Sequence, residues 1–233
     1  MPKPVSTWLK DLPRTRLLAE FSMWSADLVR LADDLVRIEP HADLLHVDVA
    51  DGHFAPALLF FPDLVARMRE VTAKPIHVHL MVEDRILLNQ IEQFAEAGAD
   101  LISIHAENGT VADQALRLLG QLGVAKGMVV RVETPVARIQ PYLDRLDFLT
   151  LLGTAIGVKG QGLDPRAGDR LLEAAELIAA TGRAVGLAAD GGIRENTVPL
   201  LRKAGAETVV MGSLAFGASD LAARLQWLHG LER

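Results

Sequence analysis

The sequence contains no cysteine, no long apolar run and no excess of positive charge. Without cysteine the protein forms no disulfide and offers no thiolate to a metal, so histidine nitrogens and carboxylate oxygens are the ligands available. No apolar stretch reaches the roughly 18 residues that a membrane span requires, and the first residues lack the apolar region of a signal peptide. We therefore expect a cytoplasmic protein that does not enter a membrane.

The charge balance and the length narrow the class of protein further. The net charge is −6, which argues against a nucleic-acid-binding surface. Half of the 233 residues are hydrophobic and 23% are charged, so a full core is expected and disorder is not. No linker or low-complexity tract divides the chain. We predict a single domain over residues 1–233, with residues 1–15 as an extra N-terminal helix or arm.

Short apolar runs recur along the chain at spacings of 21 to 38 residues. They end near Ser22, Asp48, His79, His105, Arg131, Leu152, Asp190 and Gly212. Segments of helical period lie between them, at residues 27–38, 61–71, 86–97, 111–122, 171–180 and 196–204. Eight strands alternating with eight helices predict an α/β fold, a single-domain (β/α)8 TIM barrel. An open, doubly wound sheet is the alternative.

Three short signatures close three of these runs: His46-Val-Asp48, His77-Val-His79 and Asp190-Gly-Gly192. Side chains two residues apart on a strand point to the same side, so each pair faces together. In a barrel, the C-terminal strand ends converge on one mouth. Imidazoles and carboxylates gathered there predict a divalent-metal site, with a carboxylate available for acid–base chemistry. These ligands suit zinc, ferrous iron, manganese or cobalt better than calcium.

Glycine-rich turns follow the last three predicted strands. Gly191-Gly192 and Gly212-Ser213 follow the seventh and eighth runs, where many barrels bind phosphate through backbone N–H groups. A third turn, with Gly157 and Gly160, follows the sixth run and is placed to close over the same site. Together the turns predict a phosphate subsite, in which Lys159 is placed to add a point charge.

Longer motifs around these residues resemble the ribulose-phosphate 3-epimerase family. They are Ser22-Met-Trp-Ser-Ala-Asp27, Leu45-His-Val-Asp-Val-Ala-Asp-Gly-His-Phe-Ala-Pro56, His79-Leu-Met81, Asp190-Gly-Gly-Ile193 and Val210-Met-Gly-Ser-Leu-Ala-Phe216. The resemblance spans about residues 18–220. It implies a ribulose-phosphate-binding type of barrel that inverts C3 of a ketose phosphate such as ribulose 5-phosphate.

The resemblance also implies roles for individual residues. His46, Asp48, His79 and Asp190 match the metal ligands, and Asp48 and Asp190 match the two acid–base residues. One carboxylate would take the C3 proton and the other would return one to the opposite face of a metal-stabilised enediolate. The implied substrate contacts are Ser22, His79, Met81, Gly157, Gly160, Gly191, Gly192, Gly212 and Ser213. His77 has no matching role, so we expect it to be structural.

The chain departs from the family pattern around the sugar rather than at the ligands. Ala50 stands where methionine is common, and Ala57 stands where asparagine usually follows the proline. The loop Thr154-Ala-Ile-Gly-Val-Lys-Gly-Gln161 keeps both glycines and the glutamine but lacks the usual proline and aromatic residue. We therefore expect the chain to retain the family's reaction, inversion at C3 of a ketose phosphate. The substrate is left open among pentulose, hexulose and tetrulose phosphates.

Two other functions remain as alternatives. One is a related phosphosugar barrel of another class, a decarboxylase or an aldol-type lyase. No lysine ends any of the first five predicted strands, which counts against both. The other is a noncatalytic phosphosugar-binding protein, which would need a broken catalytic pair. We expect a small phosphorylated sugar as substrate, one divalent metal ion per subunit and assembly into a homo-oligomer, and we expect neither a nucleic acid nor a membrane as partner.

Overall fold

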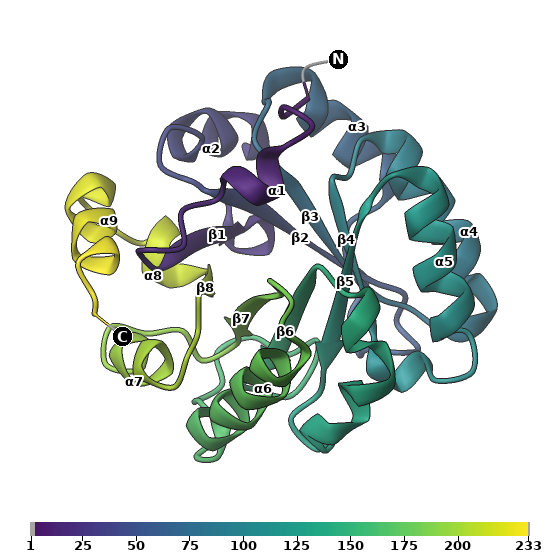
Figure 1. Ribbon diagram of the computed structural model, residues 1–233. Helices are drawn as coiled ribbons and strands as arrows, with labels where there is room; N and C mark the ends of the chain where they lie inside the picture. Colours follow the sequence, from purple (N-terminus) through teal and green to yellow (C-terminus); the bar gives the residue numbers. More distant parts are fainter. Residues whose placement is uncertain (1–2, 233) are drawn as a thin grey trace.

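The computed structural model describes residues 3–232, in which eight parallel strands close into a barrel in sequence order (Figure 1). The closed barrel confirms the predicted fold class, and the open doubly wound sheet is wrong. Strands β1 to β8 cover Leu18–Ser22, Leu44–Ala50, Ile76–Met81, Leu101–His105, Ala125–Val130, Phe148–Leu152, Gly186–Asp190 and Thr208–Met211.

The outer ring of helices surrounds the strands, as Figure 1 shows. The α-helices are α1 (Trp8–Asp11), α2 (Leu31–Ile38), α3 (Pro62–Val71), α4 (Asp84–Ala97), α5 (Ala112–Leu122), α6 (Ala167–Thr181), α7 (Val198–Lys203), α8 (Ser213–Phe216) and α9 (Leu221–His229). Three 3-10 helices complete the set: η1 (Met23–Ser25), η2 (Ala106–Asn108) and η3 (Val136–Arg145). None of the helices in residues 3–232 is long and apolar enough to cross a membrane.

Two predicted helices differ from the structure. The segment predicted to be helical from residue 27 begins at Leu31, because the Asp27 carboxylate accepts a hydrogen bond from the Val29 N–H and holds a turn there. Between β5 and β6 the alternation of strands and helices predicts a helix, although no segment of helical period lies there, and the structure has the 3-10 helix η3 with Pro141 inside it. Proline supplies no N–H and its ring clashes with the preceding turn, so a regular α-helix is not favoured at this place.

Strand register brings the polar residues of neighbouring strands level with one another. Along the β2–β3 pair, His46 lies beside His77 and Asp48 lies beside His79. Every residue of these two strands is buried, as expected for a parallel sheet covered on both faces. The register therefore places three histidines and one aspartate side by side within the barrel.

The N-terminal segment packs against the barrel interior at the end opposite these polar residues. Trp8 and Leu12 contact a small apolar cluster at the bottom of the barrel, formed by Leu44, Leu101, Phe148 and Ala188. The cluster fills this end of the barrel with side chains, so the open mouth is at the other end.

A fully buried arginine ties the outer helices to the barrel. The Arg69 guanidinium donates to the Gly98, Thr72 and Lys74 carbonyl oxygens at 2.9–3.1 Å and pairs with the Asp100 carboxylate. Burial lowers the pKa of Arg69 and raises the pKa of Asp100, so the ion pair depends on close contact. Removing the cation would leave the carboxylate and three carbonyl groups poorly solvated.

We expect Arg69→Met to lower the free energy of unfolding by about 3–5 kcal/mol, the usual cost of breaking a buried pair. Urea denaturation followed by circular dichroism measures this change. Arg67→Met is the matched control, because the Arg67 side chain in the same helix is 77% exposed and its loss should cost less than about 0.5 kcal/mol. Equal effects of the two substitutions would contradict the role given to Arg69.

Candidate active site

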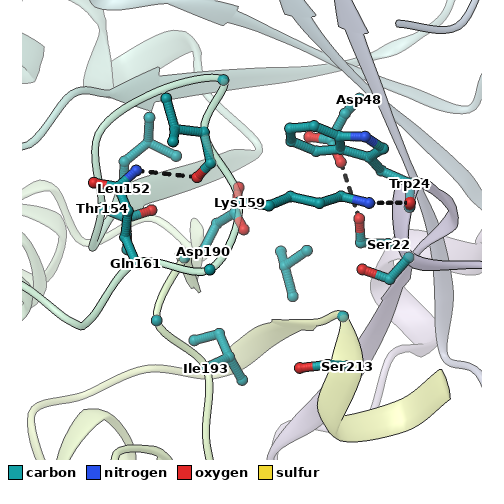
Figure 2. A pocket seen from close by; sticks show the side chains of 18 of the residues that line it. Ser22, Trp24, Asp48, Leu152, Thr154, Lys159, Gln161, Asp190, Ile193 and Ser213 are labelled. Carbon is teal, nitrogen blue, oxygen red and sulfur yellow. Dashed lines mark hydrogen bonds between the residues drawn. The ribbon is translucent and has the colours of Figure 1, made fainter. Parts of the chain in front are cut away.

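A cavity of about 570 Å³ opens at the C-terminal ends of the strands (Figure 2). Most of its wall comes from the end of β1 with η1 and from the segments after β6, β7 and β8. The structure places all but one of the predicted site residues along this wall: Ser22, Asp48, His79, Met81, Gly157, Gly160, Asp190, Gly191, Gly192, Gly212 and Ser213. The exception, His46, lies beneath the cavity and is fully buried.

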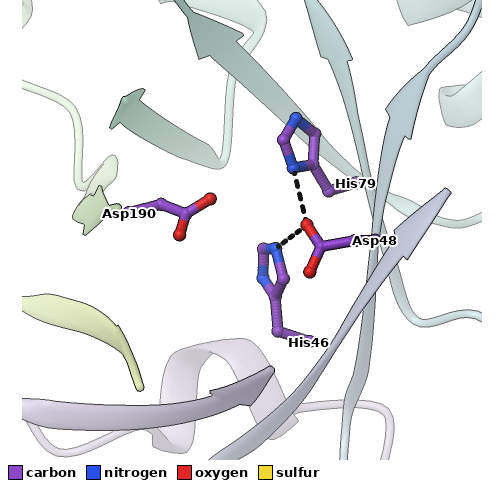
Figure 3. A group of neighbouring side chains, drawn as sticks. All are labelled: His46, Asp48, His79 and Asp190. Atoms are coloured by element: carbon purple, nitrogen blue, oxygen red, sulfur yellow. Dashed lines mark hydrogen bonds and ion pairs between the residues drawn. The ribbon is translucent and has the colours of Figure 1, made fainter. Parts of the chain in front are cut away.

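Four side chains converge on one point at the base of the cavity. His46, Asp48, His79 and Asp190 each offer one ligand atom, and these atoms lie within 4.8 Å of one another. Figure 3 shows Asp48 contacting both histidines, with Asp190 reaching toward them from β7. The Asp48 Oδ1 atom is 3.3 Å from His46 Nε2 and 3.2 Å from His79 Nδ1.

The donor set fits a divalent cation. Imidazole nitrogens and carboxylate oxygens are ligands that zinc, iron, manganese and cobalt accept. The His46 Nε2 atom is buried and points into the cluster, where its contact with Asp48 Oδ1 is too poorly aligned for a hydrogen bond. A buried nitrogen without a hydrogen-bond partner is costly unless another group binds it, so this atom favours a ligand role.

The two carboxylates of this group differ in pKa. Burial raises the pKa of Asp190 to about 6, and the negative charge of Asp48 adds to this effect. Burial also acts on Asp48, but the attraction of His46 and the close contact with both imidazoles outweigh it and hold the pKa of that carboxyl well below its usual range. The Ser22 hydroxyl also donates to Asp48 Oδ2 at 3.0 Å. Asp48 is thus held ionised, while Asp190 accepts a proton near neutral pH.

His79 is oriented by a second histidine and a glutamate. Burial lowers the pKa of His105 to about 4, so its ring is neutral. Its Nδ1 atom is 2.9 Å from the Glu107 carboxylate, which only accepts hydrogen bonds and therefore fixes the hydrogen on Nδ1. The His105 Nε2 atom then accepts from His79 Nε2 at 2.8 Å. With Nε2 joined to His105, Nδ1 is the ring nitrogen of His79 that faces Asp48 and the four-residue group.

Glu20, a residue that none of the sequence motifs singles out as functional, lies below this group. Its Oε2 atom is 2.8 Å from Nδ1 of His46 and 2.8 Å from Nδ1 of His77, and all three side chains are fully buried. His77 lies outside the cavity wall and also contacts Ser103. A signal for Glu20 is present, because it is an acidic residue in an apolar run, two positions before Ser22 and therefore on the same side of the strand.

Backbone geometry explains the glycine pair after β7. Gly191 and Gly192 have φ angles of +86° and +69°, which other residues rarely adopt. A Cβ atom on Gly192 would lie 2.8 Å from the Leu163 backbone, and one on Gly191 would lie 2.2 Å from the Thr154 hydroxyl. Only glycine therefore lets this turn approach the loop after β6 and line the cavity.

The loop after β6 reaches across the cavity to β1. The Lys159 ammonium donates to the Trp24 carbonyl oxygen at 2.5 Å and lies 4.5 Å from the centre of the Trp24 ring (Figure 2). Gln161 stabilises the loop from within by donating to the Ala155 and Val158 carbonyl oxygens. Desolvation by burial lowers the pKa of Lys159. The ammonium thus forms part of the roof of the cavity.

Comparison with known proteins extends this description. The model of the ribulose-phosphate 3-epimerase family matches residues 18–216. The chain is 38% identical over 204 residues to ribulose-phosphate 3-epimerase 2 of Cupriavidus necator, with 85% of this chain and 84% of the relative covered. It is 34% identical over 211 residues to ribulose-phosphate 3-epimerase of Bacillus subtilis, covering 90% and 96%.

Solved structures share the architecture at lower sequence identity. The 3-keto-L-gulonate-6-phosphate decarboxylase from Vibrio cholerae superposes with a TM-score of 0.68 at 14% identity, covering 92% of this chain and 99% of that chain. At this identity the likeness concerns the fold alone.

Proposed function

Because the chain belongs to the ribulose-phosphate 3-epimerase family and is therefore an epimerase of the isomerase class, we propose that it inverts C3 of ribulose 5-phosphate or a close analogue by two-base proton transfer. The observation that carries the mechanism is the pair Asp48 and Asp190. Their carboxylates come from β2 and β7, meet at the base of one cavity, and have pKa values shifted in opposite directions.

The two carboxylates divide the proton transfer between them. Asp48 is ionised and able to remove a proton from C3, while Asp190, with a pKa of about 6, is able to carry a proton and return it. In the reverse direction the roles exchange. Two bases on opposite faces of a planar enediolate give inversion, whereas one base would return the proton to the face from which it came.

We propose that His46, Asp48, His79 and Asp190 hold one divalent ion, either zinc, iron, manganese or cobalt. When bound, the ion would supply Lewis-acid stabilisation of the negative charge that develops on the substrate oxygens. The His105–Glu107 pair would keep the Nδ1 lone pair of His79 available for this purpose.

The phosphate of the substrate is proposed to lie at the glycine turns after β7 and β8. Gly191, Gly192, Gly212 and Ser213 line that side of the cavity, and their backbone N–H groups are the donors that phosphates bind in barrels of this kind. Ser22 and Met81 complete the cavity wall near the proposed ligands and are assigned to the sugar.

A screen of ketose phosphates in deuterated water tests the proposal. The purified protein is loaded in turn with zinc, iron, manganese and cobalt and incubated with pentulose, hexulose and tetrulose phosphates. Incorporation of deuterium at C3 together with the C3 epimer is the expected result, followed by NMR. If no metal and no substrate gives exchange at C3, the proposed function is wrong.

We expect Lys159→Met to raise KM roughly tenfold and to change kcat by less than about threefold, because one charge-assisted contact with the substrate would be lost. The Lys159 ammonium is partly exposed, so salt should weaken its contribution. Steady-state kinetics at low and high ionic strength measure both effects. Lys203→Met, which removes an exposed lysine of α7 outside the cavity, is the control. An unchanged KM for Lys159→Met would remove Lys159 from substrate binding.

A further inference from the structure

Glu20 lies at the centre of a buried hydrogen-bond network beneath the four-residue group of Figure 3. Its Oε2 atom contacts Nδ1 of both His46 and His77 at 2.8 Å, and Nε2 of His77 is 2.7 Å from the Ser103 hydroxyl. All four side chains are 0% exposed. The network connects β1, β2, β3 and β4 inside the barrel.

The position of the Glu20 carboxylate determines where the hydrogens lie. A single carboxylate oxygen, Oε2, lies within hydrogen-bond distance of both Nδ1 atoms. A carboxylate oxygen between two ring nitrogens accepts from each of them, so both Nδ1 atoms carry hydrogen. The Nε2 atom of His77 is then free to accept from Ser103. In a neutral His46 ring the same tautomer leaves a lone pair on Nε2, the nitrogen that faces the four-residue group at 3.3 Å from Asp48 Oδ1.

A buried carboxylate at this depth is unusual for a barrel interior, which is normally filled by branched apolar side chains. Burying an ion costs several kcal/mol, and a well-packed apolar residue is often as stable. Packing alone therefore does not account for an acid at position 20. Fixing the tautomer of a metal-binding histidine does account for it, because such histidines commonly donate their other ring N–H to a carboxylate.

We propose that Glu20 is a positioning residue that holds His46 with its Nε2 lone pair directed at the metal. The inference rests on the proposed function, since it concerns the same metal site. Glu20 also places a negative charge next to this ligand, which makes the imidazole a stronger donor. Glu20, His46 and His77 form a group that is itself able to hold a cation. In this group, however, Oε2 of Glu20 and the two Nδ1 atoms are already joined by the 2.8 Å hydrogen bonds. We therefore infer a single metal ion, held by the four-residue group.

Glu20→Gln tests the inference with little change of shape. The glutamine oxygen is able to accept from both Nδ1 atoms, as Oε2 of Glu20 does, but it carries no negative charge and is a weaker acceptor. The Nδ1–H tautomer of His46 is therefore held less firmly, and the opposite tautomer places a hydrogen on the atom that would bind the metal. We expect Co²⁺ affinity, measured by titration of the metal-free protein against a chelator, to fall roughly 10- to 100-fold.

Ser103→Ala is the matched control. It removes the far end of the same network and leaves the Glu20–His46 contact in place. We expect it to lower the melting temperature while Co²⁺ affinity stays within about threefold of the wild type, because the unpaired His77 Nε2 costs stability alone. Equal losses of affinity in both variants would show a general effect of the network and overturn the specific role of Glu20.

The outcomes separate this inference from the function on which it rests. Wild-type affinity in Glu20→Gln, or two Co²⁺ ions per wild-type chain, would overturn the positioning role and leave the epimerase function intact. Absence of Co²⁺ binding by the wild type would instead refute the metal site, and the inference with it. If Glu20→Gln fails to fold, nitrogen-15 NMR of the Zn²⁺-loaded wild type tests the inference, because it shows which ring nitrogen of His46 carries hydrogen. It should show hydrogen on Nδ1 of His46, and hydrogen on Nε2 would contradict the inference.

Discussion

Replacement of Asp48 by asparagine is expected to lower kcat for C3 epimerisation by at least about 10³-fold. Removal of a positioned acid–base group alone costs roughly 10²- to 10⁴-fold. Asp48 also contacts His46, His79 and Ser22, so the asparagine changes the charge at the centre of the proposed metal site. The amide is unable to take a proton from carbon at neutral pH, and its NH2 group faces groups that need an acceptor.

The measurement for Asp48→Asn is epimer formation under saturating metal and substrate, together with the metal content of the purified variant. Both are needed, because a loss of rate with the metal retained separates proton transfer from metal binding. Asp63→Asn, which changes an exposed carboxylate at the start of α3, should have wild-type activity. Substantial epimerase activity in Asp48→Asn would remove Asp48 from the proton-transfer step.

The strand ends are predictable because most apolar runs stop near a polar residue or a glycine. Glycines such as Gly98 and Gly123 end the helices with positive φ angles and lead directly into the following strands. Residues two apart on a strand share a side, and this periodicity alone places His46 with Asp48. The closed barrel then requires that the C-terminal strand ends meet, and Asp190 thereby reaches the same point.

Other features depend on contacts that local sequence does not reveal. Glu20 is a single acid in an apolar run. Its role is evident only in the folded barrel, where β1 pairs with β2 and Glu20 contacts two histidines. The bond between His79 and His105 likewise joins two strands. Lys159 is far from Trp24 in sequence, and only loop closure across the mouth brings them together. Sequence periodicity predicts which side of a strand a residue faces. It does not predict which residue of another strand or loop that side chain will contact.

Asp190→Asn is expected to lower kcat for epimerisation by at least about 10³-fold. The variant should nevertheless exchange the C3 proton of one of the two epimers with solvent. In a two-base mechanism each carboxylate serves one face of the substrate. With Asp190 neutralised, Asp48 is still able to remove the proton from its own face and return deuterium to that face. The C3 proton of one epimer should therefore be lost to deuterated water without inversion, while the other epimer stays unlabelled.

Proton NMR of each pure epimer, incubated separately with the variant, follows the exchange. Asp48→Asn should show the opposite preference, and the double variant should exchange neither epimer, which excludes a contribution from solvent hydroxide. Metal content is measured alongside, because Asp190 is also a proposed ligand and a weakly occupied site would slow both exchanges together. Exchange of both epimers by Asp190→Asn would contradict the two-base mechanism, since a single carboxylate would then reach both faces. The opposite epimer preferences of the two variants are therefore the result that assigns one face of the substrate to each of Asp48 and Asp190.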